Sequence, residues 1–504
     1  KLIEAYKAGY IYTLIVKDGT ELHVGEDGYD RVFDHDVIGM LATLVELGDT
    51  ADFKDYAPHI LDNVQYPDAR WKYAWPFALY LQKTGDTEYI GSVFETIKSN
   101  THYIEAERQG PNGIMKLTNA IDSDSYWLID NWAALTGLTA YKYICDALGQ
   151  TEEAAWALSQ YNALKTATET TLSETMAQYN HFAYLPIDMQ KPNPISQRKN
   201  PLDGNWAASF MFGRWAWDGY LFGAEQEGLM LDLIDDTYSY GFYRQKNVDF
   251  EAVGYSFGGY PGFSSGYNAG YGSAALRGEE YRDQGIKSYK WMIENTMSGP
   301  YSWWENIGEP TDDYWNTTHA SYGGGSCPHM WGQSVNTKVL LDSMISEKSD
   351  GTRIIGRGIP NDWIKTGERA EIDNVPVTGG KRMGYAVTTA GGGVTLTLSG
   401  DTSEPVSFEL PIFVNNIASA GGLSFDNARG AVTIPAGTAS ATVTLISKDG
   451  YQDPDAAQKK EEQEQKFAET DAIFDYQMLM QDVQKKIDKE GYNVDSVKEY
   501  AWAG

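Results

Sequence analysis

Residues 36–50, DVIGMLATLVELGDT, decide the fold. Their apolar side chains recur at the spacing of three and four that lets a helix bury one face. Gly48 suits the left-handed backbone conformation that ends a helix, and the Asp49-Thr50 pair after it can cap the next helix. The stretch therefore predicts a helix that turns sharply into a second one.

The same arrangement recurs along the chain. Helical patterns over 73–83 and 131–148 are followed by Gly85-Asp86-Thr87 and Gly149-Gln150-Thr151. About ten to twelve helices are expected, and this number favours an α/α toroid over residues 1–349, in which successive hairpins form an inner and an outer ring. The other helical patterns lie at 88–107, 152–173, 205–213, 225–238, 270–297 and 330–346.

Three long segments rich in Gly, Tyr, Trp, Asp and Pro separate these helices, at 177–204, 241–269 and 298–328. Loops of such length in a compact domain are usually functional or disordered. Their many aromatic residues argue against disorder. We expect them to form the walls of a cleft at one end of the toroid.

After about residue 350 the apolar period changes from that of a helix to that of a strand. Residues 393–400, 406–414 and 431–446 alternate or are rich in β-branched residues, with Gly, Asp and Ser between them. They predict a β-sandwich over residues 350–452. Residues 453–504 are rich in Lys, Glu and Gln and predict a charged helical tail, a solvated helix or a linker.

The composition excludes several kinds of function. With 70 acidic and 40 basic residues the net charge is −30, which would repel nucleic acid and anionic membranes. No apolar run approaches the roughly 20 residues of a membrane span, so no membrane insertion is expected. Cys145 and Cys327 fit neither a disulfide scaffold nor a zinc site. The 34 tyrosines and 15 tryptophans exceed what a core requires and suit a surface that meets sugars.

The first candidate for chemistry is Trp303-Trp304-Glu305, which follows the helix break at Gly299-Pro300. A carboxylate held between aromatic rings at a loop can activate water beside a platform for a sugar ring. The alternative is that both tryptophans close the core and that Glu305 is a surface acid.

A second acidic cluster, EDGYDRVFDHD, occupies residues 26–36. Crowded carboxyls that converge in a partly buried site raise the pKa of at least one of them, as a general acid requires. The alternative is that Asp34 or Asp36 caps the next helix.

A third acidic cluster spans residues 122–132, DSDSYWLIDNW, at the start of another helix. Its Asp-Ser-Asp-Ser could also be a set of calcium ligands, but it lacks the glycine and distal glutamate of an EF-hand loop. His329 begins a further helix, where it binds a substrate hydroxyl, caps the helix or sits in the core.

Taken in order, these segments resemble the catalytic part of the α-L-rhamnosidase-type six-hairpin glycosidases, inverting enzymes built on an (α/α)6 barrel. Residues 33–36 look like the family's Trp-x-Gly-Asp segment, and residues 68–76 look like its next aromatic helix pair. Residues 303–305 look like the Trp-Glu that carries its general base, and His329 with the helix after it looks like its closing segment. The resemblance covers roughly residues 20–450 and implies an (α/α)6 toroid followed by a β-sandwich.

The sequence departs from the family at the acid motif, Asp-x-x-x-Arg-Glu, in whose place residues 26–31 read EDGYDR. We expect Asp30 to be the general acid and Asp36 to bind a sugar hydroxyl, with Asp34 or Asp124 as alternative acids. The departure also weakens rhamnose as the substrate. The residues expected to bind substrate are Arg70, Trp75, Trp127, Asp130, Trp303, Trp304, His329 and Trp331.

These expectations describe an exo-acting, inverting glycoside hydrolase whose base is Glu305. It needs no metal or redox cofactor, its partner is a carbohydrate, and this substrate class implies an extracellular or cell-surface location. The N-terminal β-domains usual in the family are missing from the sequence, which suggests a trimmed chain. Two alternatives stay open: a polysaccharide lyase that uses Tyr and His, and a carbohydrate-binding surface protein without catalysis.

Overall fold

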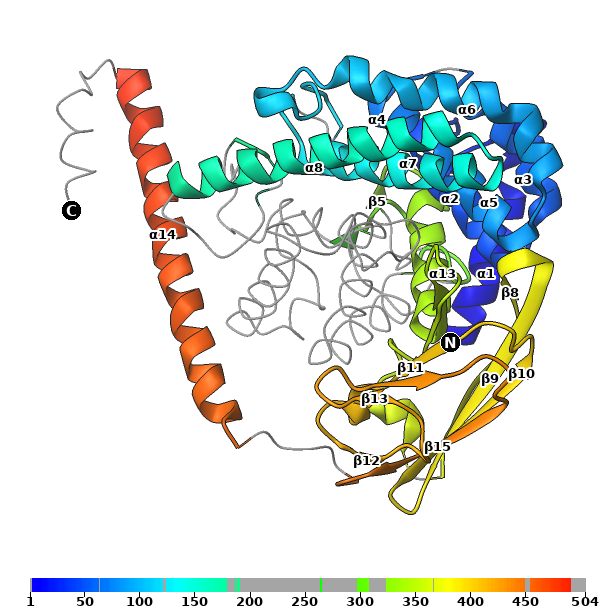
Figure 1. The fold of residues 1–504 in the computed structure, drawn as a ribbon. Helices are drawn as coiled ribbons and strands as arrows, with labels where there is room; N and C mark the ends of the chain where they lie inside the picture. Colours follow the sequence, from blue (N-terminus) through cyan, green and yellow to red (C-terminus); the bar gives the residue numbers. More distant parts are fainter. Residues whose placement is uncertain are drawn as a thin grey trace.

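The computed structural model describes residues 2–62, 64–120, 124–178, 186, 188–190, 263–264, 297–307, 323–365, 367–448 and 454–490. Figure 1 shows a mainly helical N-terminal region, a β region below it, and one long helix at the side. Across these ranges, no helix is both long enough and apolar enough to span a bilayer.

The predicted hairpins are confirmed where the structure describes them. The described helices of the N-terminal region are α1 (Leu2–Ile15), α2 (Asp34–Leu47), α3 (Thr50–Tyr56), α4 (Pro67–Trp71), α5 (Ala74–Thr84), α6 (Thr87–Glu107), α7 (Leu128–Ala147) and α8 (Thr151–Gln178), with 3₁₀ turns at Ala57–His59 and Pro111–Gly113. Helix α13 (Met330–Met344) packs against α1 and α2.

The residues that end one helix and cap the next lie where the sequence predicts them. Gly48 adopts φ 90° and donates its backbone N–H to the carbonyls of Leu44 and Val45, which closes α2. The Asp49 carboxylate then accepts a hydrogen bond from the backbone N–H of Asp52 and caps α3. Asp86 caps α6 in the same way, by accepting from the N–H of Tyr89.

The helical core forms where α2, α5 and α7 pack side by side, with α8 against α7. Their apolar side chains belong to one buried cluster. Gly137 of α7 lets α4 approach closely, since a Cβ there would lie 1.7 Å from the carbonyl oxygen of Trp71. These contacts hold together the helices that carry the second and third acidic clusters.

The described helices differ from the predicted ones at the N-terminus, and three of the predicted helices cannot be compared. The sequence placed the start of the helical pattern near residue 35 and missed α1, whose exposed Ile3 and Ile11 blur its one-sided pattern. The helices predicted at 205–213 and 225–238, and nearly all of that at 270–297, lie outside the described residues. Closure of the toroid therefore stays a prediction.

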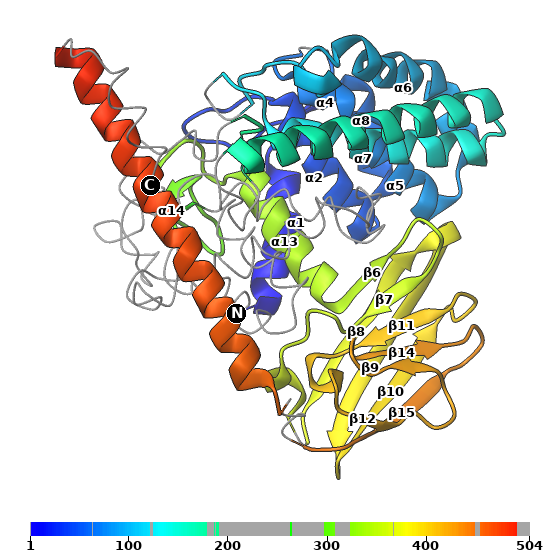
Figure 2. The same ribbon diagram turned by 60° about the vertical axis from the view of Figure 1, so that its left-hand side comes forward.

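The β region consists of two five-stranded sheets that share one buried apolar cluster, and Figure 2 shows their labelled strands. One sheet has the order β12-β15-β10-β9-β8, with bounds Ile417–Ser419, Ser440–Leu445, Gly393–Gly400, Lys381–Ala390 and Arg369–Val377. The other has the order β13-β14-β11-β7-β6, with bounds Phe425–Asp426, Ala431–Ile434, Val406–Glu409, Arg353–Ile355 and Ile345–Glu347.

Neighbouring strands in both sheets run antiparallel except β11 and β7, which are parallel. The strands predicted within 393–400, 406–414 and 431–446 are therefore confirmed. Short pairings outside these sheets join β1 (Lys17–Asp18) to β2 (Glu21–Leu22), and β4 (Asn306–Ile307) to both β3 (Phe263–Ser264) and β5 (Gly323–Gly324). Further 3₁₀ turns lie at Asn361–Ile364, Thr378–Gly380 and Pro411–Phe413.

The predicted charged tail is helical. Helix α14 (Ala456–Glu490) runs along the side of the molecule in Figures 1 and 2. Among its described side chains Phe467 and Thr470 are buried, whereas most of the others described are exposed.

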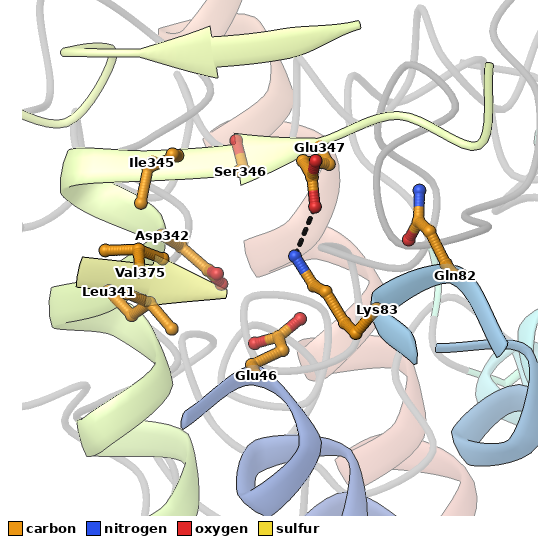
Figure 3. A pocket seen from close by; sticks show the side chains of 9 residues that line it. All are labelled: Glu46, Gln82, Lys83, Leu341, Asp342, Ile345, Ser346, Glu347 and Val375. Carbon is orange, nitrogen blue, oxygen red and sulfur yellow. Dashed lines mark hydrogen bonds and ion pairs between the residues drawn. The ribbon is translucent and has the colours of Figure 1, made fainter. Parts of the chain in front are cut away.

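Buried ion pairs join α13 to α2, and α5 to the β region. Lys338 of α13 contacts Glu46 of α2 at 2.7 Å and Asp342 at 2.9 Å, and Lys83 of α5 pairs with Glu347 of β6. They surround a small cavity, shown in Figure 3, which is lined by Glu46, Gln82, Lys83, Leu341, Asp342, Ile345, Ser346, Glu347 and Val375. Because buried charges are tolerated when they are paired, these contacts fix α13 against α2 and α5.

Candidate active site

Three extended segments, distant in sequence, lie side by side ahead of α13. The backbones of Asp27 and Cys327 exchange two hydrogen bonds of 3.1 and 3.0 Å. On the other side, the N–H of Glu305 donates to Ser326 at 3.1 Å and that of His329 donates to the carbonyl of Trp303 at 2.9 Å. The segment of Cys327 thus joins the second acidic cluster to Glu305.

Two glycines allow this close approach. A Cβ on Gly28 would lie 1.7 Å from the carbonyl oxygen of Gly325. Gly325 itself has φ +83°, and a Cβ there would lie 2.0 Å from Oε2 of Glu305 and 2.8 Å from the hydroxyl oxygen of Tyr29. The carboxylate of Glu305 and the phenol of Tyr29 therefore face the same small space above Gly325.

The environment of Glu305 changes its chemistry. Burial raises the pKa of Glu305 to about 7, because a carboxylate loses solvation when it leaves water. Its side chain remains partly exposed, as does the neighbouring Trp304. At neutral pH this carboxyl can therefore take up or release a proton, which is the property of a general base.

The two tryptophans before Glu305 differ in position. Trp303 is 1% exposed and packs with Ala5, Met297 and Leu340, as the core interpretation of this residue predicts. Trp304 is partly exposed. Only Trp304 of the two is therefore placed to meet a ligand in this structure.

Asp30, the expected general acid, lies in an exposed ion pair with His23, whose other ring nitrogen contacts Glu21 at 3.0 Å. If Asp30 is the general acid, its carboxyl donates the proton while it is paired with the His23 imidazole. Asp124, an alternative acid, is exposed and accepts a hydrogen bond of 3.3 Å from Asn119.

Asp34 has a structural place. It is fully buried, and one carboxylate oxygen accepts from the backbone N–H groups of Gln65 at 2.7 Å and Tyr66 at 3.2 Å. The other oxygen accepts from the N–H of His35 at 2.9 Å. Capping by Asp34 or Asp36 is not observed, because α2 begins at Asp34 and Phe33 occupies its N-cap position.

Asp36 belongs to a chain of charged groups. Its carboxylate lies 3.1 Å from Nε2 of His35, whose Nδ1 lies 3.5 Å from Asp68. The other oxygen of Asp68 lies 2.7 Å from the Lys72 ammonium. Burial alone would raise the pKa of Asp68, but the two cations outweigh it and hold that pKa well below its usual range.

The two histidines around Asp36 have opposite states. Burial alone would lower the pKa of His35, but the carboxylates of Asp36 and Asp68 raise it to about 10. Burial lowers the pKa of His329 to about 4, although the charge of Asp36 acts in the other direction. At neutral pH His35 is therefore an imidazolium, whereas His329 is a neutral imidazole.

Asp130 is buried beside this chain of charges. The Thr118 hydroxyl donates to it at 2.5 Å, and burial, reinforced by Asp68, raises the pKa of Asp130 well above its usual range. Trp127 is 1% exposed and donates from its indole N–H to the Thr118 carbonyl at 3.2 Å. Asp122 and Ser123 lie outside the described residues, and among those that are described no group of three or more His, Cys, Asp or Glu could hold a metal ion.

The remaining residues that were expected to bind substrate differ in their exposure and in their contacts. Trp75 is 1% exposed in α5. Arg70 places its guanidinium 4.3 Å from the centre of the Tyr103 ring. Trp331 is partly exposed, with its ring 5.5 Å from that of His329 at 72°. Sequence reasoning could not separate core tryptophans from exposed ones, because an aromatic residue at helical spacing suits both places.

Some residues near the site were given no role from the sequence, namely Tyr29, His35, Tyr66, Asp68 and Lys72. Asp68 and Lys72 carried a usable signal, since opposite charges four residues apart pair on a helix. His35 and Tyr66 carried none, because they lie 31 positions apart in the sequence and their rings stack only after folding.

No protein-family model and no curated protein matches this sequence. Among solved structures the chain is similar to the Streptomyces avermitilis α-L-rhamnosidase complexed with L-rhamnose, with a TM-score of 0.49 and 12% identity over 87% of this chain and 41% of that one. It is also similar to the α-L-rhamnosidase from Dictyoglumus thermophilum, with a TM-score of 0.44 and 10% identity over 88% of this chain and 49% of that one. The chain spans less than half the length of either enzyme. At this level of similarity, roles for the site residues have to come from contacts within this chain.

Proposed function

We propose that the chain is an exo-acting, inverting glycoside hydrolase in which Glu305 is the general base. The observation that carries the proposal is the Glu305 carboxyl, whose pKa burial raises to about 7, in a partly open position that it shares with Tyr29. A base whose pKa lies near the working pH combines the ionised form with a useful affinity for the proton.

The reaction divides between two carboxyl groups. Glu305 takes a proton from a water molecule, whose oxygen attacks the anomeric carbon as the bond to the leaving oxygen breaks. The leaving oxygen takes its proton from an acid of residues 26–36. We assign this role to Asp30, because the oxygens of Asp34 are bonded to backbone N–H groups. The segment of Asp27, three residues before Asp30, is also joined through that of Cys327 to Glu305.

Several contacts favour a carbohydrate as the ligand. Trp304 and Trp331 are partly exposed rings close to Glu305 and His329 along the chain, and partly exposed rings of this type stack on sugar faces. Asp36 offers a carboxylate whose side chain is 15% exposed and could bind a hydroxyl group. A substrate that is part of a polysaccharide would place the enzyme outside the cell or at its surface.

The test is hydrolysis of a panel of nitrophenyl glycosides, including the α-L-rhamnoside, and of plant and bacterial polysaccharides. We expect Glu305→Gln to lower kcat/KM by roughly 10²- to 10⁴-fold on any substrate that the wild type cleaves, the usual contribution of a general base. Glu368→Gln, an exposed glutamate of the β region, is the matched control and should retain full activity.

Three outcomes would contradict the proposal. Unchanged hydrolysis by Glu305→Gln would remove the base. An ultraviolet-absorbing unsaturated product would indicate a lyase, and binding without turnover across the panel would indicate a carbohydrate-binding protein. Nuclear magnetic resonance (NMR) of the first-formed anomer separates inversion from retention.

A further inference from the structure

We propose that His35 is a positioning residue, a fixed cation that holds the Asp36 carboxylate in place for contact with the substrate. This rests on the proposed function for the contact with substrate, but the arrangement of the three groups can be tested without any substrate.

The orientation of His35 is fixed by stacking. Its ring lies on that of Tyr66, with 3.9 Å between centroids and 8° between planes. The Asp34 carboxylate also holds the two residues in place, because it accepts hydrogen bonds from the backbone N–H groups of both His35 and Tyr66. A ring held in this way aims its two nitrogens in fixed directions.

Those two directions end on carboxylates. Nε2 lies 3.1 Å from Asp36 and Nδ1 lies 3.5 Å from Asp68, while Lys72 neutralises the far oxygen of Asp68. Both ring nitrogens of an imidazolium donate, so the cationic ring can serve both carboxylates at once. The neutral ring could donate to only one of them.

Helix stability does not account for a cation at this place. His35 lies in the first turn of α2, where the helix dipole favours negative charge and disfavours positive charge. Asp34 and Asp36 suit that turn, but His35 does not. The gain that offsets this cost is the alignment of Asp36.

Asp36 in turn acts on His329. The side chain of Asp36 is 15% exposed, and its charge bears on the buried ring of His329. The titratable groups that surround this arrangement are Asp34 and Asp36 of α2, Asp68 and Lys72 at α4, Asp130 of α7 and His329 ahead of α13.

The first experiment is an NMR titration of the histidine rings in the wild type and in His35→Gln. Removal of the cation leaves the charge of Asp36 to act on His329 without compensation, so we expect the pKa of His329 to rise by roughly 1. His35→Lys, which keeps a cation, should restore most of the wild-type value. His59→Gln, a surface histidine paired with Asp62, is the matched control and should change nothing at His329.

Asp36→Asn keeps the experiment decisive if His35→Gln does not fold. In that variant the pKa of both histidines should fall, because the carboxylate that raises each of them is gone. An unchanged titration of His329 in whichever variant folds would overturn the proposal.

The second experiment uses any glycoside that the wild type hydrolyses. Loss of alignment at a hydroxyl-binding carboxylate should raise KM roughly tenfold in His35→Gln with a smaller effect on kcat, and His35→Lys should recover part of it. A KM equal to that of the wild type would overturn the positioning role. Absence of any hydrolysis would count against the proposed function instead, and the titration would still decide the arrangement of His35.

Discussion

Glu305 and His35 are both titratable residues whose state is set by their neighbours. Burial raises the pKa of Glu305 to about 7. His35 is also largely withdrawn from solvent, but two carboxylates keep it charged. Loss of solvation therefore favours the neutral form of Glu305, whereas at His35 ion pairing outweighs it and favours the charged form.

The first prediction at this scale concerns the pH dependence of stability. An unfolded glutamate titrates near about 4.3, so the folded protein binds the Glu305 proton more tightly than the unfolded chain does. The stability that this proton contributes is present at low pH and is lost as the pH rises from about 4 to 7. Glu305→Gln, which has no charge to bury, should exceed the wild type in stability by about 1 to 3 kcal/mol at pH 8 and match it near pH 4.

Urea denaturation of both proteins at several pH values measures this difference. The same ionisation should appear as an acidic limb near pH 7 in kcat/KM, since the base acts in its ionised form. A stability difference that does not change with pH would mean that the Glu305 carboxyl is solvated in the folded protein.

At the scale of elements, glycine has different roles in different helices. Gly48 ends α2 in a left-handed conformation that a side chain would strain. Gly137 lies inside α7 with helical geometry, and its role is to admit the backbone of α4. Gly91 also lies inside a helix, α6, but a Cβ there would meet nothing within 4 Å.

This contrast gives a paired prediction. Gly91→Ala should stabilise the protein by about 0.5 to 1 kcal/mol, because alanine loses less backbone freedom on folding. Gly137→Ala should destabilise it by about 1 to 3 kcal/mol, since α4 and α7 must move apart. Chemical denaturation of both variants measures the two signs, and a stabilising Gly137→Ala would contradict the described crossing of the helices.

At the scale of the whole molecule, the site depends on how three parts of the chain meet. The segments around Asp27, Glu305 and Cys327 come together ahead of α13. Helix α13 is in turn held by Lys338, which pairs with Glu46 of α2 and with Asp342. The buried ion pairs of Lys338 therefore also support the site.

The prediction at this scale is that Lys338→Met destabilises the protein by about 3 to 5 kcal/mol, because Glu46 and Asp342 would stay buried without their cation. Lys365→Met is the control, since its pair with Asp362 is exposed to solvent and should contribute little to stability. Thermal and urea denaturation measure both. A loss in Lys338→Met no larger than that in the control would show that the junction is open to water.

Local sequence patterns predicted much of the fold. The helix ends at Gly48 and Gly85, the strands within 393–400 and 431–446, and the helical tail all follow from periodicity and from glycine or aspartate at fixed positions. Helix α1 was missed because its apolar residues are spread around its circumference, with Ile3 and Ile11 exposed.

The sequence by itself determined most of the described helices after α1 and several strands of the β region, and that Glu305 stands next to aromatic rings, because these properties depend on neighbours along the chain. Only the tertiary structure decided that Trp303 is buried while Trp304 is partly open, that Asp34 binds backbone, and that His35 lies between Asp36 and Asp68. Solvation and ion pairing depend on groups that approach through space, so residues distant in sequence set the chemistry of this site.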